Sequence, residues 1–264
     1  MADSLKFETI KLDIRGKVAW VILNRPEIRN AFNNVMISEM TLAFKHINSR
    51  DDLRVVVVTG EGKAFCAGAD LKWMKGVMAY SYEENLQDSQ NLSDMFAEMA
   101  NCPLPTIARV DGPAIGGGTG MVAVNDIVIA SPNALFSLSE VKLGLVPACI
   151  SPYVIRRMGD KNCREYFLTG ERLNAEKALA AGLVNRVVPE DKLDGEVDKL
   201  IKQLISSGPN ALGWCKNLLA KVPPMGQKEY GQYTAEVITK LRMSDEGQEG
   251  MKAFFEKRKP NWCE

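Results

Sequence analysis

The chain has 264 residues, 46% of them apolar, which is enough to bury a large core in one domain with an appendage. Basic and acidic residues number 33 each, so no overall field attracts nucleic acid or an anionic membrane surface, and any anionic ligand must meet a local cluster of charge. The six cysteines show no C-x-x-C spacing, which favours reduced, buried thiols over a disulfide framework or a zinc site.

The N-terminal residues 1–6 are followed by no apolar run, and no stretch approaches the length of a membrane span. We therefore expect neither a secretion signal nor a transmembrane segment, and we expect a cytoplasmic protein. The single histidine, His46, excludes a histidine-based catalytic triad or metal centre.

Hydrophobic periodicity predicts alternating strands and helices in the first half of the chain. Apolar alternation at 10–14 and the apolar run 18–23, separated by Gly16, predict a β-hairpin. Apolar residues at helical spacing within 36–47 precede the strand-like run 55–59. The pattern continues with a helix at 92–99 and strands at 106–110 and 126–130. This alternation is typical of an α/β fold built from repeated β-β-α turns.

From residue 174 onward the pattern becomes mainly helical, with one apolar face over 197–205. Further helices are expected near 210–221 and 228–241. The last helix is expected to begin after Ser244 and to include the basic run 257–259 in its final turn. No linker separates the two regions, so we divide the chain at residue 200 into a core of residues 1–200 and a helical region of residues 201–264.

Two stretches of small residues, 64–71 and 112–120, each follow a strand-like run. Their side chains are too small to block a ligand from the backbone, and Gly116 to Gly118 open a predicted helix with free N–H groups. Either stretch alone is ordinary turn chemistry. Together they look like the two halves of one oxyanion hole.

These stretches and three further motifs resemble the crotonase superfamily, the enoyl-CoA hydratase/isomerase family. The further motifs are Leu23-Asn24-Arg25-Pro26 with Asn30-Ala31, residues 136–147 and residues 249–258. The resemblance implies the α/β crotonase fold, a repeated β-β-α spiral core that holds the coenzyme A and acyl sites. It also implies that the C-terminal helices are a trimerisation region, packing between subunits of a homotrimer or a dimer of trimers. Residues 141–153 and 166–172 look most like the bacterial methylglutaconyl-CoA hydratase branch.

The resemblance implies that the backbone N–H groups of Ala69 and Gly117 stabilise an enolate oxygen and that Glu140 transfers the proton. Glu140 lies in the largely uncharged segment 136–141, where desolvation would raise its pKa toward neutrality. Asp70 is also suited to capping a helix that begins at Leu71. The other loop residues expected at the substrate site are Ala67, Gly68, Asp70, Leu71 and Gly116.

Coenzyme A carries an adenine ring and several phosphate charges, so basic and aromatic residues are expected beside the hole. Arg25 and Arg29 bracket an earlier loop, the one between these two residues, and the resemblance places it along the pantetheine and adenine. The resemblance also implies that Phe254 and Lys257 reach the nucleotide of a neighbouring subunit. We expect coenzyme A as part of the substrate and neither a metal nor a redox cofactor.

The chain departs from the family pattern at Gly120, where typical enoyl-CoA hydratases carry a second glutamate. Hydration by Glu140 alone, or with the help of a carboxylate on the substrate, is favoured because the methylglutaconyl branch tolerates a small residue there. Enoyl-CoA isomerisation and acyl-CoA decarboxylation remain alternatives. A non-catalytic RNA-binding or scaffold protein is a remoter alternative, against which the balanced charge argues.

A substrate carboxylate at the far end of the acyl group would need a basic partner. Sequence position leaves five candidates: Lys72, Lys75, Lys142, Arg156 and Arg157. Aromatic and methionine residues within 73–82 would shape the acyl-chain pocket. We therefore expect an acyl-CoA enzyme that hydrates a short 2-enoyl-CoA, methylglutaconyl-CoA in particular.

Overall fold

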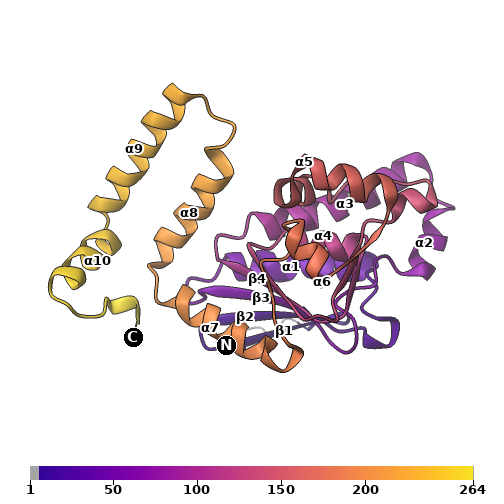
Figure 1. The fold of residues 1–264 in the computed structure, drawn as a ribbon, viewed down its shortest axis with the longest axis horizontal. Coiled ribbons are helices and arrows are strands. Elements are labelled where there is room, and N and C mark those ends of the chain that lie inside the picture. Colours follow the sequence, from indigo (N-terminus) through magenta and orange to yellow (C-terminus); the bar gives the residue numbers. More distant parts are fainter. Residues whose placement is uncertain (1–5, 264) are drawn as a thin grey trace.

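The computed structural model describes residues 6–263 and consists of two β-sheets covered by helices (Figure 1). Residues 1–5, part of the segment from which the absence of a secretion signal was expected, and residue 264 lie outside the described residues. The larger sheet runs in the order β1-β2-β3-β4-β6-β9. Its strands are β1 (Ile10–Arg15), β2 (Val18–Leu23), β3 (Val55–Gly60), β4 (Thr106–Val110), β6 (Ile127–Ala130) and β9 (Arg186–Val187).

The predicted hairpin is confirmed as β1 and β2, which pair antiparallel from Ile10 opposite Leu23 to Arg15 opposite Val18. All other neighbours in the larger sheet are parallel, so each connection must cross over through helices. The predicted helices and strands between residues 36 and 130 are confirmed as well. The crossover helices are α1 (Asn34–Asn48), α2 (Leu71–Val77), α3 (Tyr82–Ala100) and α4 (Gly117–Ala123).

A second sheet gives the core its spiral form. β5 (Pro113–Ile115) pairs parallel with β7 (Leu135–Ser137), which pairs antiparallel with β8 (Arg172–Asn174). Each of β4 and β6 is followed within a few residues by a strand of this second sheet, so the chain repeats a β-β-α turn. An isolated bridge between Cys66 and Ala114 joins the preceding turn to the same sheet.

Both faces of the larger sheet are buried, which explains the continuous valine run in β3. Val56 and Val58 face the main core, which α1, α3, α4, α5 (Ser151–Thr169) and α6 (Ala175–Ala180) cover. Val55 and Val57 face a smaller cluster on the other side, where α7 (Leu193–Ile205) packs. This alternation follows from the two-residue period of a strand.

The C-terminal helices α8 (Pro209–Lys221), α9 (Gln227–Met243) and α10 (Asp245–Phe255) form an arm that stands away from the core (Figure 1). The division at residue 200 falls inside α7, whose Leu200 and Ile201 pack against the sheet. The arm therefore begins at Pro209, because α7 is part of the core.

The end of the last helix differs from the sequence expectation. Ser244 caps α10 as expected, accepting from Gly247 N at 3.1 Å, but the basic run does not form its last turn, since the helix ends at Phe255. Lys257 has a φ of 54°, and Arg258 N donates to Ala253 O at 3.0 Å. This left-handed residue and its hydrogen bond make a Schellman stop, which turns the chain before the basic run.

None of the helices within residues 6–263 is both long and apolar enough to cross a membrane.

Candidate active site

The first loop of the expected oxyanion hole, residues 64–71, is anchored by a buried asparagine from an earlier turn. Residues 112–120 form the second loop. Asn30 is 0% exposed, and its Nδ2 donates to Glu61 O at 2.9 Å and Ala64 O at 2.8 Å. Its Oδ1 accepts from Arg25 N at 2.9 Å. Because a buried amide left without partners would destabilise the fold, these bonds fix the segment from which the loop departs.

The far end of the same loop is held by an ion pair. Arg25 Nη2 lies 2.9 Å from Asp70 Oδ2, with both side chains largely buried, and Arg25 Nη1 donates to Ala31 O at 2.6 Å. Burial alone would raise the pKa of Asp70, but the N–H groups of Lys72 and Trp73 and the Arg25 guanidinium together lower it. Asp70 thus caps α2 as expected and at the same time ties this helix to Arg25.

Between these anchors the loop leaves one backbone donor without an acceptor among the described residues. Phe32 N donates to Gly68 O at 2.9 Å, and Asp70 N donates to Phe32 O at 2.8 Å. These two bonds bracket Ala69, whose N–H has no acceptor among residues 6–263. Gly68 adopts a φ of 95°, a conformation that L side chains rarely take. The loop therefore supplies a fixed, unpaired N–H at the position expected from the sequence.

The second loop lies directly beside the first. Cys66 N donates to Pro113 O at 3.1 Å, and Ile115 N donates to Cys66 O at 2.9 Å. The next residue, Gly116, has a φ of 53° and donates to Ser137 O at 2.8 Å. Gly117 then begins α4, and a first-turn N–H has no partner within its own helix. Two donors without an acceptor among residues 6–263, the N–H groups of Ala69 and Gly117, thus lie on paired loops.

The Phe32 ring packs between the two halves of the hole. A Cβ on Gly117 would lie 2.6 Å from Cε1 and Cζ of Phe32, closer than such atoms approach. Phe32 also contacts Trp73 of α2, with ring centroids 5.6 Å apart. Since Phe32 also carries the backbone bonds that bracket Ala69, its position sets both donors.

Thr119 holds α4 in place from the buried side. Its hydroxyl lies 2.7 Å from Ala114 O and 3.0 Å from Ser137 O, and it is 0% exposed. These contacts join the first turn of α4 to β5 and β7. The N–H of Gly117 therefore belongs to a helical turn that the Thr119 hydroxyl holds against the second sheet.

Glu140 places a carboxylate beside these donors. It opens the short 3-10 turn that follows β7, and a Cβ on Gly116 would lie 3.2 Å from its Oε1. Its Oε2 is buried and has no hydrogen-bond partner among the described residues. Burial raises the pKa of Glu140 above its ordinary value. A desolvated carboxylate with an unused lone pair is suited to taking and returning a proton near neutral pH.

Gly120 does not leave an open space where a second carboxylate could stand. It lies on α4, and a Cβ there would come 2.1 Å from Cγ2 of Ile150 and 3.2 Å from Cζ of Phe96. Gly120 therefore takes part in packing and carries no group that can titrate. That Gly120 belongs to the site stays a prediction.

Comparison with known proteins identifies the architecture. A sequence profile described as enoyl-CoA hydratase/isomerase matches residues 13–264. The chain belongs to the enoyl-CoA hydratase/isomerase family. It is 37% identical over 248 residues to a putative enoyl-CoA hydratase of Thermus thermophilus, covering 94% of this chain and 98% of the relative.

Solved structures of the family have the same fold. An enoyl-CoA hydratase from Shewanella pealeana superimposes with a TM-score of 0.94 at 40% identity, covering 97% of each chain. A putative enoyl-CoA hydratase/isomerase (crotonase) from Legionella pneumophila gives 0.92 at 40% identity, covering 97% of this chain and all of the other. The protein is therefore a crotonase-fold enzyme of the enoyl-CoA hydratase/isomerase family, as the sequence motifs predicted.

For an enzyme of this family, the coenzyme A moiety of the substrate must be held outside the oxyanion hole. Arg29 lies beside the first loop, since its carbonyl accepts from Ala67 N at 2.9 Å. Its side chain is exposed and is therefore available to an anion. Leu71 is 82% exposed and follows Asp70. The Arg25 side chain is instead occupied by Asp70 and Ala31, so it positions the loop.

Phe254 and Lys257 are not brought to this site within one chain. Phe254 is 78% exposed on α10, and Lys257 follows that helix in the arm. Figure 1 shows α10 at the opposite end of the molecule from α2, which directly follows the first oxyanion loop. Within one chain, these two residues therefore lie apart from the first loop.

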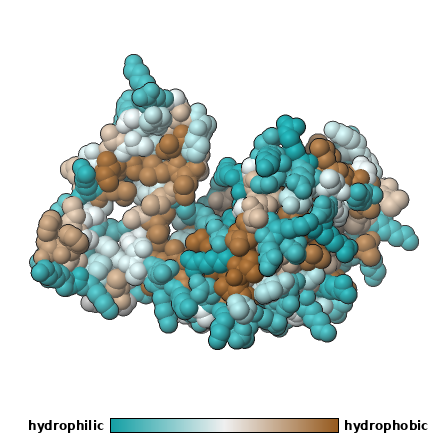
Figure 2. Space-filling view, in the orientation of Figure 1, coloured by the Kyte–Doolittle hydropathy of each residue, from teal (hydrophilic) through white to brown (hydrophobic). Residues whose placement is uncertain are grey.

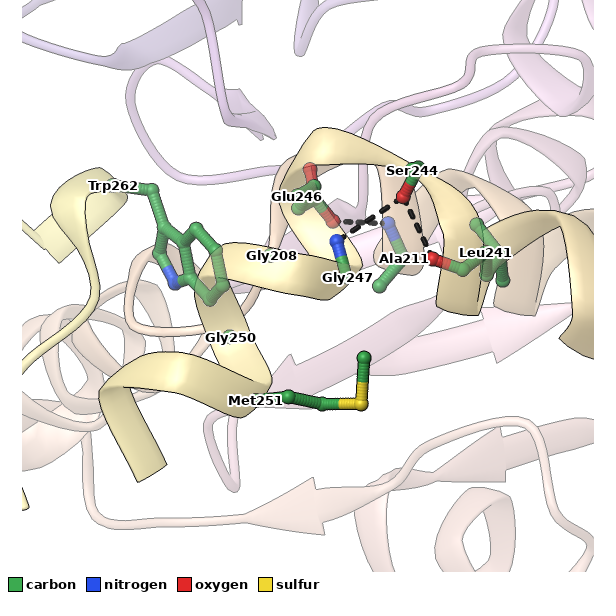
Figure 3. Close-up of a pocket in the computed structure, with 9 residues that line it drawn as sticks. All are labelled: Gly208, Ala211, Leu241, Ser244, Glu246, Gly247, Gly250, Met251 and Trp262. Carbon is green, nitrogen blue, oxygen red and sulfur yellow. Dashed lines mark hydrogen bonds between the residues drawn. The ribbon is translucent and has the colours of Figure 1, made fainter. Parts of the chain in front are cut away.

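A cavity of about 280 Å³ lies in the arm rather than at the oxyanion loops (Figure 3). Glu246 in its wall accepts from Asn210 N and Ala211 N, both at 2.9 Å, and so caps α8. Ser244 donates to Leu241 O at 2.7 Å. Because these polar groups already form hydrogen bonds within the arm, the cavity is part of the interface between α8 and α10.

The other groups that could carry chemistry are occupied or buried. Cys66 lies in the first loop, but burial raises the pKa of its thiol to about 12, so it stays protonated at neutral pH. Within residues 6–263 no three or more His, Cys, Asp or Glu side chains gather as a metal site would require. Glu140 differs from Cys66 and Asp70 in having a buried side-chain oxygen that lacks a hydrogen-bond partner among the described residues.

Proposed function

We propose that this enzyme hydrates a short 2-enoyl-CoA whose acyl group carries a distal carboxylate, methylglutaconyl-CoA in particular. The observation that carries the proposal is the buried Glu140 carboxylate, with an oxygen that lacks a partner among the described residues, beside the unpaired N–H groups of Ala69 and Gly117. The family relation supports thioester chemistry at this place.

In the proposed mechanism, the thioester oxygen accepts from the N–H groups of Ala69 and Gly117, which stabilise the charge that develops on it. Glu140 removes a proton from water as the water oxygen bonds to the β-carbon, and the β–α double bond becomes the enolate. Glu140 then returns this proton to the α-carbon, so that the net change is addition of one water. One carboxylate is sufficient because it accepts and donates the same proton.

The second polar group that would help orient water is then supplied by the substrate. Arg156 supports this part of the proposal, because it is exposed on α5 and forms no ion pair among residues 6–263. Its charge acts on Tyr153: burial raises the pKa of Tyr153, and Arg156 partly opposes that rise. The Tyr153 ring contacts Phe96, which reaches Gly120, with centroids 5.9 Å apart. Arg156 is thus our candidate partner for the distal carboxylate.

The other basic candidates are less suitable. Arg157 donates to Leu183 O at 2.6 Å and Asn125 O at 2.7 Å, so its guanidinium holds the core together. The Lys142 side chain lies against Gly170, which caps the C-terminal end of α5, whereas Arg156 lies near the start of that helix. Lys72 and Lys75 are exposed on α2 and carry no such link to Gly120.

The same observation also permits a second reaction. One carboxylate can remove a proton from the α-carbon of a 3-enoyl-CoA and return it to the γ-carbon, which gives the 2-enoyl isomer without water. The absence of a titrating side chain at Gly120 favours this isomerisation over a two-carboxylate hydration. Decarboxylation of an acyl-CoA would use the two N–H donors alone, and it would not explain a desolvated Glu140.

The proposed assembly is a homotrimer or a dimer of trimers. Figure 2 shows hydrophobic residues gathered over α8 and the adjoining part of α9. Exposed apolar side chains of the arm include Leu219 at 75%, Met243 at 78% and Phe254 at 78%. Apolar surface of this kind marks an interaction site. A second copy of the chain on this surface is also what Phe254 and Lys257 need to reach coenzyme A.

The proposed function is tested with a panel of thioesters: methylglutaconyl-CoA, crotonyl-CoA and a 3-enoyl-CoA, with products identified by mass spectrometry. We expect a mass gain of one water from methylglutaconyl-CoA, at a kcat/KM at least about tenfold above that for crotonyl-CoA, or about 1.4 kcal/mol. Equal kcat/KM values would remove the role of the distal carboxylate. Conversion of the 3-enoyl-CoA to its 2-enoyl isomer, with no hydrated product from any thioester, would establish the isomerase.

A further inference from the structure

Two glycines at the start of α4 approach two different side chains. Gly116 is the N-cap of the helix and Gly120 lies within its first turn, where Gly120 N donates to Gly116 O at 3.1 Å. Glu140 stands over Gly116, with Oε1 3.2 Å from the Cβ position, and Ile150 stands over Gly120, with Cγ2 2.1 Å from it. The carboxylate and the isoleucine therefore pack on two glycines that a backbone hydrogen bond joins.

Ile150 is fixed in this position by its surroundings. It is 3% exposed, belongs to the main core and directly precedes α5, where its carbonyl accepts from Val154 N at 3.1 Å. Phe96 closes the other side, 3.2 Å from the Cβ position of Gly120. Apolar atoms of Ile150 and Phe96 thus fill the space next to Gly120.

We propose that Ile150 is a specificity-determining residue of this site, resting on the proposed hydration. By occupying the space over Gly120 it excludes a second protein carboxylate from position 120 and fills that space with apolar atoms. A plain acyl chain then has only Glu140 to hold and activate water. An acyl group with its own carboxylate brings the missing polar partner, so Ile150 selects dicarboxylic over monocarboxylic thioesters.

The contact between Ile150 and Gly120 predicts that position 120 can accept glutamate only if the Ile150 side chain is removed. Since Cβ of Ile150 is itself 2.7 Å from the Cβ position of Gly120, alanine would still clash, and glycine is the substitution required. The experiment compares Gly120→Glu, Ile150→Gly and the double variant with the wild type. A control double variant combines Gly120→Glu with Ile155→Ala, which changes an exposed isoleucine in α5, the helix that Ile150 precedes.

Thermal unfolding is the first readout, because it does not depend on any reaction. We expect Gly120→Glu to lower Tm and Ile150→Gly to reverse part of that loss, whereas Ile155→Ala reverses none of it. Additive changes in Tm would show that the two side chains do not compete for one space and would overturn the proposal, even if the wild type hydrates methylglutaconyl-CoA as expected.

Turnover is the second readout. The double variant should hydrate crotonyl-CoA at least about tenfold faster than Ile150→Gly alone, the low end of what a positioned acid–base group contributes. Its preference for methylglutaconyl-CoA should narrow accordingly. A folded double variant with no gain on crotonyl-CoA would overturn the role of Ile150 in specificity. Failure of the wild type to hydrate any thioester would instead overturn the proposed function, while the unfolding data would still report on the packing.

Discussion

The Phe32 ring lies against Gly117, so closely that a Cβ on Gly117 would be 2.6 Å from two of its ring atoms. The backbone of the same phenylalanine brackets Ala69. The two proposed oxyanion donors, which lie 48 positions apart in the chain, are therefore coupled through one residue, Phe32. A change at either donor is expected to move the other.

Gly117→Ala is expected to lower kcat by roughly 10²–10³, because its methyl group displaces Phe32 and with it the alignment of both N–H donors. Substrate affinity should change much less, since the donors act mainly on charge that develops during the reaction. Gly76→Ala is the control, as a Cβ at this exposed position of α2 meets nothing within 4 Å. Steady-state kinetics should leave this control unaltered. A Gly117→Ala enzyme with the wild-type kcat would place the hole elsewhere.

Asn30→Asp is expected to reduce the free energy of unfolding by at least about 2 kcal/mol, because two buried donor bonds would be replaced by a carboxylate that faces two carbonyl oxygens. Chemical denaturation measures this loss. Asn34→Asp is the control, since Asn34 is exposed at the start of α1, where a negative charge is tolerated or mildly favourable. Equal losses in the two variants would mean that Asn30 is not a specific anchor of the loop.

Arg156→Gln is expected to raise KM for methylglutaconyl-CoA by about tenfold or more while leaving KM for crotonyl-CoA within about twofold. The reason is that only the dicarboxylic substrate can form a charged hydrogen bond with the guanidinium. Lys161→Gln removes an exposed charge from the same helix and should affect neither substrate. A parallel rise in KM for both thioesters would indicate a contact with coenzyme A, and no change for either would exclude Arg156.

Glu140→Gln is expected to raise Tm at pH 8. The folded-state pKa of Glu140 is raised above its ordinary value of 4.5, so its favourable contribution is present below pH 4.5 and is lost as the pH rises through the folded pKa. Above that range the buried carboxylate is ionised, and replacing it by a neutral glutamine removes the free-energy cost of burying that charge. Each kcal/mol gained should raise Tm by about 2–4 °C. Differential scanning calorimetry at pH 8 and pH 4 tests this, with exposed Glu165→Gln as control. A Tm gain as large at pH 4 as at pH 8 would contradict the assigned cause.

The alternating elements and the two oxyanion loops could be predicted because they depend on local signals. The period of apolar residues reveals a strand such as β3 or a helix such as α1, and runs of small residues mark the loops. Glu140 was predicted from its motif together with the uncharged residues around it, and its burial agrees with the expected direction of its pKa.

Packing partners could not be predicted in the same way. Nothing in the sequence places Phe32 against Gly117 or Ile150 against Gly120, because both contacts join segments that are distant in the chain and that only the folded spiral brings together. The ion pair of Arg25 could not be predicted for a related reason. A basic residue beside the loop favours an anion site, but the fold gives its guanidinium an internal partner in Asp70.

The measurement that tests the central claim most directly is the kcat of Glu140→Gln with methylglutaconyl-CoA, alongside calorimetric binding of a saturated acyl-CoA. The account predicts a fall in kcat of at least roughly 10²-fold with little change in affinity, because general acid–base groups contribute about 10²–10⁴. It also predicts that the wild-type rate falls on the acid side at a pH above 4.5 and that the variant lacks this dependence. A Glu140→Gln enzyme that binds the thioester and turns over at near the wild-type rate would contradict the account.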